Sequence, residues 1–400
     1  MKYLENSSIP SINDLTIDHY ETLAVQTNQY SSKAEVALDN IMLGFFGEAG
    51  SLLSVVKKKT RDDISSARYH HAVEEELGDF LWYYTMVCHL SGIRLSEIAT
   101  LSANRDIKKP RPKVRFSDVQ QQFSRSRKTE MSRLIRQLIS LAGEVGDLTD
   151  FYARNRQKHS SEQITGYLIP IMKSLLRAAS AAGIDLQSAA VDNLYKTFDR
   201  WPHGKKVYPS LLDSEHEDKT ERLPRKFQIR VEQRIKRGKR YVFQTCNDIN
   251  IGDPLTDNIR DEDFYRFHDV FHYAYAAKLG WSPVTRALFK LKRKSDPTTD
   301  EAEDGARAIL IEEGLATMIF NHAKSANMFQ DVKPGELSFD LLKTVREFVA
   351  GYEVESMPLW LWEEAILEGF ACFRFLKEKK AGIIKLNLDK HSISVSELRA

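Results

Sequence analysis

Residues 74–84 read EEELGDFLWYY, the stretch that says most about the fold of this chain. The acidic residues at its start pass directly into a run of large apolar and aromatic residues. Glu76 and Asp79 stand three positions apart, so in a helix both carboxylates share one face. Apolar residues recur at helical spacing from about residue 67 to residue 90, which predicts a long helix around this stretch.

The stretches on either side also have the spacing of helices. One helix is expected over about 15–30, a second over about 35–59, and a short one after Ser91-Gly92-Ile93, where the glycine can end the preceding helix. Glu48 lies in the second of these, within the apolar string IMLGFFGEAGSLLSVV. The first part of the chain is therefore expected to be a helical bundle.

Two interpretations fit the acidic residues of this bundle. If the face of Glu48 meets the face of Glu76 and Asp79, several carboxylates converge in apolar surroundings. Their mutual repulsion then calls for a hard cation, and Mg²⁺ is the natural one. Alternatively, residues 74–79 are the acidic first turn of a helix, which the helix dipole favours. Spacing alone leaves both interpretations open.

Residues 131–202 repeat the pattern. The string LISLAGEVGDLTDFY is similar to the string around Glu48, and Ala182-Gly183-Ile184 matches Ser91-Gly92-Ile93. The period is about 90–95 residues, which is too long for a solenoid unit and predicts a duplicated helical bundle.

These motifs resemble those of the MazG-type, all-α nucleoside triphosphate pyrophosphohydrolases. Such proteins have an EExxE motif on one helix and an ExxD motif, in a string like ELGDxLWY, on a later helix. Residues 76–83, ELGDFLWY, match the second motif closely. Gly47-Glu48-Ala49-Gly50-Ser51 matches the first only in part, since Gly47 and Ser51 stand where carboxylates are usual.

In the second repeat the departures are reversed. Glu144 and Asp147 preserve an acidic pair, but Tyr167 and Pro170 occupy the positions that align with the ExxD motif. Two models of the site follow. In one, a single weakened site uses first-repeat carboxylates and the second repeat is a structural partner. In the other, a composite site takes ligands from both repeats, as sites between facing helices of a bundle do.

The resemblance implies Mg²⁺-dependent cleavage of a nucleoside triphosphate between its α and β phosphates, which gives the monophosphate and pyrophosphate. Carboxylates would hold the metal, and the metal or one carboxylate would activate water. The residues implied are, for catalysis, Glu48, Glu75, Glu76 and Asp79; for the metal, Glu48, Glu76, Asp79, Glu144 and Asp147; and, for phosphate binding, Lys57 and Lys58.

The incomplete motifs leave a second function open. The chain would then be a catalytically weakened nucleotide-binding sensor, with its C-terminal domain as an effector or interaction module. Lys57 and Lys58 would in that case be a solvated helix end as readily as a phosphate contact. A homodimer is expected for either function.

A polar stretch at 204–225 is expected to be a linker. After it, alternating apolar and polar residues in KFQIRVEQ and KRYVFQTC predict a β-hairpin that turns at Arg237-Gly238-Lys239. Most of the remaining chain has helical spacing. The region at about 220–390 resembles the domain found C-terminal to MazG modules in some bacterial proteins, a resemblance that implies no particular activity.

His268 and His272 make up a second candidate site. They are four positions apart and share a helix face, a common arrangement for two metal ligands. A transition metal such as Zn²⁺, Mn²⁺ or Fe²⁺ would suit them together with carboxylates. Alternatively, both are core residues that hydrogen-bond a carbonyl or an acidic partner. The full set of candidates is His268, Asp269, His272, Glu312, Glu313 and Glu364, with Arg266 and Lys292 as phosphate contacts.

Composition restricts the class of protein. The 400 residues have a formal net charge of +2, which argues against a protein that coats a polyanion. Nucleic acid is therefore not a favoured partner, although residues 105–136 are strongly basic. The three cysteines form no CxxC pair, no apolar signal segment is seen, and no uninterrupted apolar run approaches membrane-spanning length. These features predict a cytoplasmic protein that does not enter a membrane.

The predicted fold class is mainly α. Two MazG-like helical-bundle repeats are expected at residues 1–108 and 109–203. The linker at 204–225 and a mostly helical domain with a short β-hairpin at 226–400 follow them.

Overall fold

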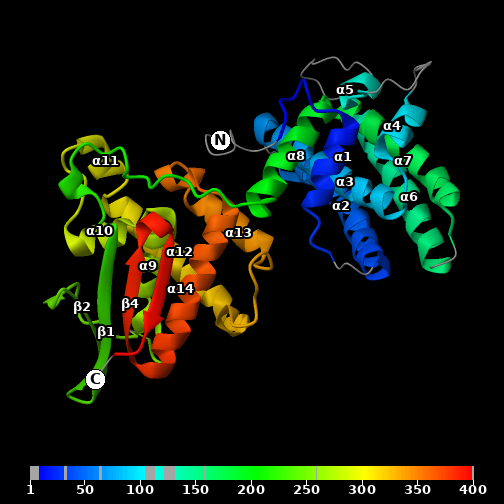
Figure 1. Ribbon diagram of the computed structural model, residues 1–400. Coiled ribbons are helices and arrows are strands. Elements are labelled where there is room, and N and C mark those ends of the chain that lie inside the picture. The colour runs from blue at the N-terminus through cyan, green and yellow to red at the C-terminus, as the bar shows by residue number, and fades with distance from the viewer. Residues whose placement is uncertain are drawn as a thin grey trace. The chain divides into compact units, whose positions relative to one another are not determined.

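The computed structural model describes residues 9–30, 34–62, 65–103, 113–120, 131–156, 159–257 and 259–398. The chain forms two compact units, Asn6–Gly204 and Lys205–Ala400 (Figure 1). The first is helical, and the second combines helices with a small antiparallel sheet, so the predicted mainly α class is confirmed. Most of the basic stretch at 105–136 lies outside the described residues.

The N-terminal unit is a bundle of helices. They are α1 (Ile17–Gln26), α2 (Ala34–Asp62), α3 (Ser66–Leu90), α4 (Leu95–Ser102), α5 (Phe116–Val119), α6 (Met131–Arg154), α7 (Ser161–Ala182) and α8 (Leu186–Arg200). The helices predicted at 35–59 and 67–90 correspond to α2 and α3. α2 extends past the predicted end at residue 59, to Asp62.

The same turn joins α3 to α4 and α7 to α8. Gly92 and Gly183 adopt left-handed conformations with φ of +69° and +73°. The next residue, Ile93 or Ile184, donates its N–H at 2.9 Å to the carbonyl five positions back and buries its side chain. This is the glycine-terminated helix end with a hydrophobic contact after it. It fixes the direction in which each short helix leaves.

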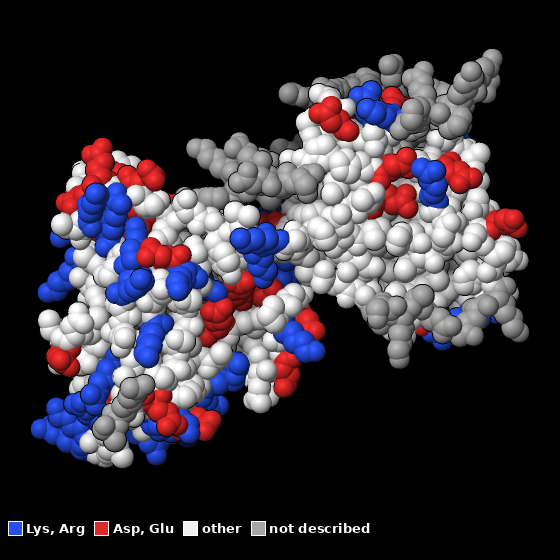
Figure 2. Space-filling view, in the orientation of Figure 1, with Lys and Arg blue, Asp and Glu red and all other residues white. Residues whose placement is uncertain are grey.

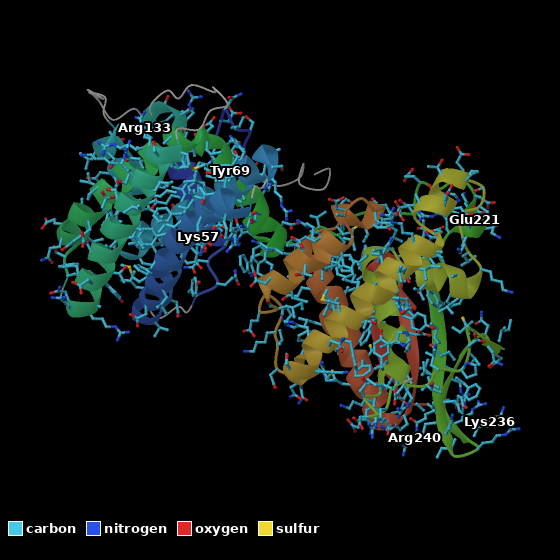
Figure 3. All side chains as sticks on the ribbon, turned by 180° about the vertical axis from the view of Figure 1, so that it is seen from behind. Lys57, Tyr69, Arg133, Glu221, Lys236 and Arg240 are labelled. Atoms are coloured by element: carbon cyan, nitrogen blue, oxygen red, sulfur yellow. The ribbon has the colours of Figure 1, made fainter. Side chains whose placement is uncertain are left out.

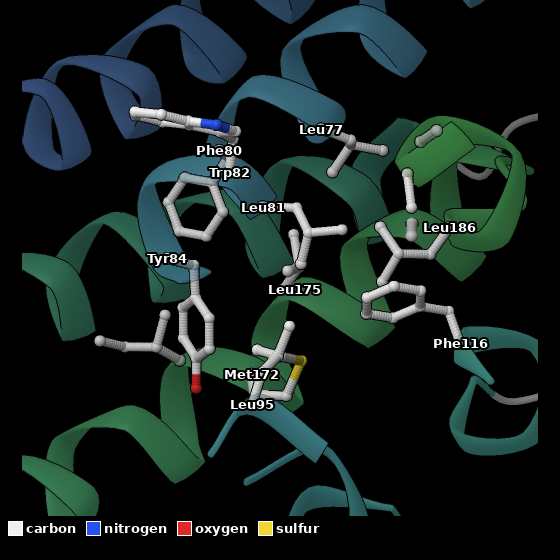
Figure 4. Close-up of a cluster of buried hydrophobic side chains, with 14 of the residues drawn as sticks. Leu77, Phe80, Leu81, Trp82, Tyr84, Leu95, Phe116, Met172, Leu175 and Leu186 are labelled. Atoms are coloured by element: carbon white, nitrogen blue, oxygen red, sulfur yellow. The ribbon is translucent and has the colours of Figure 1, made fainter. Parts of the chain in front are cut away.

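Helices from the two predicted repeats exchange partners. α3 packs against α8, α4 packs against α7, and α2 packs against α6. At Gly78 a side chain would meet the Ala189 carbonyl at 2.9 Å and the Asn193 Cβ at 3.0 Å, so α3 and α8 are in close contact there. A single hydrophobic core runs through the whole unit, and Figure 4 shows part of it.

By length and composition alone, the α2 stretch Val36–Arg61 would also suit a membrane span, the one such stretch among the described residues. Core helices of water-soluble proteins pass the same test. One face of α2 does form part of the core, where Ile41, Phe45 and Leu52 are buried.

The C-terminal unit contains a five-stranded antiparallel sheet of order β3-β2-β1-β4-β5. The strands are β1 (Lys226–Lys236), β2 (Lys239–Cys246), β3 (Ile249–Asn250), β4 (Ala381–Asn387) and β5 (Ser392–Ser396). The predicted hairpin is confirmed, because Lys236 pairs with Lys239 across a two-residue turn. Arg237 and Gly238 both have positive φ in this turn, as the favoured hairpin turns require.

The rest of the C-terminal unit is mainly helical. They are α9 (Asp269–Leu279), α10 (Pro283–Phe289), α11 (Pro297–Ala302), α12 (Ala306–Ser325), α13 (Phe339–Phe348) and α14 (Leu359–Lys379), with 3₁₀ turns at Lys219–Glu221, Tyr265–Phe267, Asn327–Phe329, Glu353–Ser356 and Leu388–Lys390. α9 packs against α14, and both contact β4 and β5. Every residue of α9 is buried, since its sequence DVFHYAYAAKL has no polar face. Any ionisable side chain on α9 is therefore inside the protein.

Basic side chains gather at the tip of the β1–β2 hairpin. Lys236, Arg237, Lys239 and Arg240 are all exposed there. Figure 2 shows this end of the unit as its densest blue area, and Figure 3 labels Lys236 and Arg240 on it from behind.

Candidate metal centres

Three of the predicted carboxylates meet in the N-terminal unit. Glu48 comes from α2, and Glu76 and Asp79 come from α3. One carboxylate oxygen of each lies within 4.8 Å of the others, and all three residues are half-buried. We call Glu48, Glu76 and Asp79 the carboxylate cluster. Its convergence agrees with the interpretation that the faces of the two helices meet.

Helix α8 holds Asp79 in place. The Asn193 side-chain amide donates to Asp79 Oδ1 at 2.9 Å, and the Tyr20 hydroxyl donates to Asn193 Oδ1 at 3.4 Å. The contact between Asn193 and Asp79 depends on the close approach of α3 and α8 at Gly78, where any larger residue would collide with α8. The glycine within the ELGD string thus brings a second polar helix to the cluster.

Lys196, also on α8, supplies a positive charge beside the cluster. Its ammonium donates to Glu75 Oε1 at 2.8 Å and to Asp79 Oδ2 at 2.5 Å. Burial lowers the pKa of Lys196, but the two carboxylates outweigh burial and raise the pKa above its usual value. The ammonium therefore stays charged at neutral pH and offsets part of the local negative charge.

An aromatic residue, Tyr83, lies one helical turn after Asp79 and packs against α2. Tyr83 packs over Gly44, where an added Cβ would lie only 2.1 Å from the Tyr83 ring. Its hydroxyl is 2.9 Å from that of Tyr30. Burial, the Tyr30 contact, and the charges of Glu48 and Asp79 raise the pKa of Tyr83 far above its usual range. Tyr83 is thus a neutral wall next to the carboxylates.

The acidic residues of the second repeat do not join the carboxylate cluster. Glu144 on α6 accepts hydrogen bonds from Ser174 at 2.9 Å and Ser140 at 3.2 Å, and burial raises its pKa. Neither Glu144 nor Asp147 is among the residues whose ligand atoms converge. The described contacts therefore favour a single site with first-repeat carboxylates, to which the second repeat adds Asn193 and Lys196 rather than ligands.

No role was predicted from the sequence for the polar residues of α8. Asn193 and Lys196 are three positions apart and so share a helix face, a signal that could have been read in DNLYKTF. The predicted phosphate contacts Lys57 and Lys58 are exposed on α2, where Figure 3 labels Lys57.

A second group of ligand atoms converges in the C-terminal unit. Atoms of His268, Asp269 and His272 lie within 4.8 Å of one another at the start of α9. Glu313 of α12 joins them, with Oε2 at 3.6 Å from His268 Nε2 and 3.5 Å from His272 Nε2. We call these four residues the histidine cluster.

Hydrogen bonds fix the orientation of both imidazole rings. His268 Nδ1 lies 2.9 Å from the carbonyl of Tyr265, and His272 Nδ1 lies 2.9 Å from Glu312 Oε1. Glu312 has no exposed surface and also accepts from the Ser282 hydroxyl at 2.7 Å and the Val284 N–H at 2.8 Å. Both Nε2 atoms thereby face Glu313.

The charges of this cluster are strongly coupled. Burial lowers the pKa of His272, but Glu312 and Glu313 outweigh burial and raise the pKa to about 10. The carboxyl of Glu313 responds in the opposite direction, since His268 and His272 hold its pKa well below the usual range in spite of burial. With protein groups alone, His272 would be a buried imidazolium between two carboxylates.

The other candidates of this region lie apart from the histidine cluster. Glu364 accepts from Lys206 at 2.6 Å and from Tyr208 at 3.0 Å, and it pairs with Lys278 at 3.0 Å. Arg266 is only 1% exposed, and its guanidinium is already bonded to side chains such as Gln233 and Asp257. Lys292 is half-buried in the segment after α10. The described contacts give no support to phosphate binding by Arg266.

Comparison with known proteins identifies one part of the chain. Residues 208–399 match the family model described as the MazG C-terminal domain. The predicted MazG-associated C-terminal domain is therefore confirmed, while the match does not extend into the N-terminal unit. No curated protein and no solved structure matches the chain.

Proposed function

We propose that the N-terminal unit is a Mg²⁺-dependent nucleoside triphosphate pyrophosphohydrolase that releases the nucleoside monophosphate and pyrophosphate. The observation that supports this function best is the convergence of Glu48, Glu76 and Asp79 within 4.8 Å, from two different helices. The match of residues 208–399 to the MazG C-terminal domain adds support, because it is consistent with a MazG-like, nucleotide-related function.

The donor set of the carboxylate cluster fits Mg²⁺. All three side chains offer carboxylate oxygens, the ligands that this hard cation prefers, and they are half-buried rather than sealed from substrate. Glu48, Glu76 and Asp79 would hold the ion, which when bound would neutralise phosphate charge and lower the pKa of a coordinated water.

The other residues act through charge and position. Lys196 supplies a fixed positive charge to phosphate oxygens as negative charge develops on the leaving pyrophosphate. Glu75 lies outside the carboxylate cluster but shares Lys196 with Asp79. As a carboxylate in this position, it can accept the proton of the attacking water. Tyr83 and the apolar residues around it limit the access of bulk water.

The test is a panel of ribo- and deoxyribonucleoside triphosphates, with and without Mg²⁺, assayed for pyrophosphate release. Glu76→Gln and Asp79→Asn should each lower turnover on the order of 100-fold or more, because each removes a direct metal ligand. Glu97→Gln is the matched control, since Glu97 is an exposed acid on the neighbouring α4. Full turnover in both cluster variants would exclude this site.

A nucleotide-binding sensor without turnover is the second candidate function. The observation that favours it is the absence of carboxylates at Gly47 and Ser51, which leaves three acids in the carboxylate cluster. Calorimetric titration of the same nucleotides distinguishes the two functions. Tight, Mg²⁺-dependent binding with no pyrophosphate release from any member of the panel would establish the sensor.

A further inference from the structure

We propose that the histidine cluster of the C-terminal unit binds a divalent transition metal ion through His268, His272, Asp269 and Glu313. This site is separate from the carboxylate cluster, and neither depends on the other. Its residues come from the start of α9 and from α12, both within the unit Lys205–Ala400.

The orientation of the two imidazoles is the first argument. The Tyr265 carbonyl can only accept, so His268 Nδ1 carries a proton, and in the neutral ring Nε2 then has the free lone pair. A bond from His272 Nδ1–H to the Glu312 carboxylate gives the second ring the same tautomer. Carbonyl and carboxylate acceptors on Nδ1 are the usual partners that orient metal-binding histidines.

The second argument is a buried nitrogen that lacks a hydrogen bond. His272 Nε2 is inaccessible to solvent and has no hydrogen-bond partner, although its ring is fully buried. The nearest acidic oxygen, Glu313 Oε2, is 3.5 Å away, at the limit of hydrogen-bond length. A buried polar atom without a partner is unfavourable, and a metal ion between it and Glu313 would satisfy it.

The third argument is that the surroundings are built to hold these side chains. Glu312 is completely buried and receives the Ser282 and Val284 bonds described above, so it cannot turn away from His272. Asp269 is bonded by the side chain of Gln244, which the Tyr273 hydroxyl fixes in turn at 2.7 Å. Three of the four proposed ligands are thus positioned by further contacts, as in known metal sites.

The donor set selects the metal class. Two imidazole nitrogens with carboxylate oxygens suit Zn²⁺, Fe²⁺ or Mn²⁺ better than Mg²⁺ or Ca²⁺, which take oxygen ligands. The Glu313 side chain is 40% exposed, whereas the other three proposed ligands are at most 12% exposed, so the site is most open to solvent on the Glu313 side. A small molecule that binds metals could approach the ion from that side.

The alternative is a charge network made of protein groups alone, with His272 protonated between Glu312 and Glu313. It needs no ion and predicts no metal affinity. Binding of Zn²⁺ and Co²⁺ therefore distinguishes the two states.

The experiment uses the full chain, stripped with a chelator and titrated with Zn²⁺ and with Co²⁺ in the presence of excess Mg²⁺. Excess Mg²⁺ competes for sites made of carboxylates alone, and the ligand variants described next assign the remaining signal to the histidine cluster. We expect one tightly bound ion per chain, and Co²⁺ absorption bands in the visible range that indicate nitrogen ligands.

The variants are His268→Gln and Glu313→Gln, whose side chains are partly exposed and tolerate replacement better than His272. Each should weaken Zn²⁺ binding by roughly 100-fold or more, since a ligand is lost. The controls are His322→Gln and Glu378→Gln, both at exposed positions of the same unit. Circular dichroism confirms that each variant is folded.

Zn²⁺ binding that is absent from the wild type, or equally strong in the ligand variants and the controls, would overturn the proposal. Such a result would leave the protonated His272 network as the description of the cluster. The pyrophosphate-release assay is read at the carboxylate cluster, so either proposal can fail without the other.

Discussion

At the scale of single residues, the ammonium of Lys196 and the proposed Mg²⁺ compete for the same carboxylate. The ammonium neutralises Glu75 and Asp79, yet Asp79 is also a proposed ligand of Mg²⁺. In the proposed site the same lysine would therefore oppose Mg²⁺ binding and assist phosphate binding. A variant without the Lys196 charge allows its effects on Mg²⁺ binding and on turnover to be measured separately.

For Lys196→Met we expect tighter Mg²⁺ binding in the absence of nucleotide, because Asp79 Oδ2 loses its competing cation. Turnover should nevertheless fall on the order of 100-fold, since a charge that stabilises the transition state is lost. Calorimetric Mg²⁺ titration and pyrophosphate release measure the two effects. Arg154→Met, which removes an exposed charge from α6, is the control. Weaker Mg²⁺ binding in Lys196→Met would contradict the competition.

In the C-terminal unit, Asp213 is a buried carboxylate whose charge contributes to stability. The carboxylate has no exposed surface and accepts from the Leu223 N–H at 2.7 Å. It also pairs with Arg225 at 2.7 Å and Arg286 at 2.8 Å. Burial alone would raise the pKa of Asp213, but these donors outweigh burial and lower the pKa below its usual value. Removing the charge would leave the buried Arg286 with Asp304, at 3.6 Å, as its acidic partner.

Asp213→Asn should lower the free energy of unfolding at neutral pH by about 3–5 kcal/mol, the usual cost of breaking a buried ion pair. The contribution of a lowered pKa is present above the unfolded value of about 4 and is lost as pH falls through the folded value. The difference between wild type and variant should therefore shrink in acid. Urea denaturation at pH 7 and below pH 4 measures it. The exposed Asp253→Asn should change stability by less than about 0.5 kcal/mol at either pH.

At the scale of helices and strands, α2 has room for the carboxylates that its motif lacks. An added Cβ at Gly47 would meet nothing within 4 Å. Ser51 stands one turn after Gly47 and three residues after Glu48, on the side of the helix that bears the cluster. At Gly47 the departure from the motif is thus a missing side chain rather than blocked space.

Gly47→Glu combined with Ser51→Glu should tighten Mg²⁺ binding and increase pyrophosphate release, provided the carboxylate cluster is the active site. Gly143→Glu on α6 is the matched control, because Gly143 aligns with Gly47 and is equally unobstructed. It should add helix stability of up to about 1 kcal/mol and leave Mg²⁺ affinity unchanged. Equal effects of both changes would show that the gain is not specific to the cluster.

Helices could be predicted from sequence where their pattern was local. α2 and α3 follow from apolar spacing, and the turns at Gly92 and Gly183 follow from the Gly-Ile dipeptides. β4 and β5 were not predicted, because β4 pairs with β1, some 150 residues earlier in the chain. The long separation leaves no local signal of pairing.

The candidate sites, too, could be predicted only where their residues lie on one helix. Glu76 and Asp79 were predictable as one face of one helix, and so were His268 and His272. Contacts between different helices were harder to predict, because they depend on which side chains of the two helices meet. Glu312 and Glu313 are neighbours in sequence, but one orients a histidine and the other faces both Nε2 atoms. That distinction depends on the rotation of α12, which sequence spacing does not fix.

At the scale of the whole molecule, the N-terminal unit leaves apolar surface exposed on α2. Val36, Leu43 and Phe46 are 47%, 73% and 54% exposed, and their spacing places them along one stripe of the helix. Apolar stripes of this kind are typical of interfaces between subunits. The stripe is the surface that we expect to mediate the predicted homodimer.

Leu43→Glu should convert a dimer into a monomer, because a charge at the most exposed position of the stripe would be buried without a partner. Light scattering coupled to gel filtration gives the mass. Leu310→Glu on α12, where the leucine is 69% exposed, should leave the mass unchanged. A wild-type chain that is monomeric at high concentration would contradict the expected dimer.

The exchange of partners between α3 and α8, and between α4 and α7, has a consequence for how this unit could diverge. In an assembly of two identical halves, any substitution changes both copies of the site at once. In the predicted duplication the halves belong to one chain, so Pro170 of α7 would stand where an acid is expected while Asp79 keeps its contact with Asn193. One position could then change without loss of the other. The covalent link thereby permits a division of labour in which one half provides the acids and the other half provides Asn193 and Lys196.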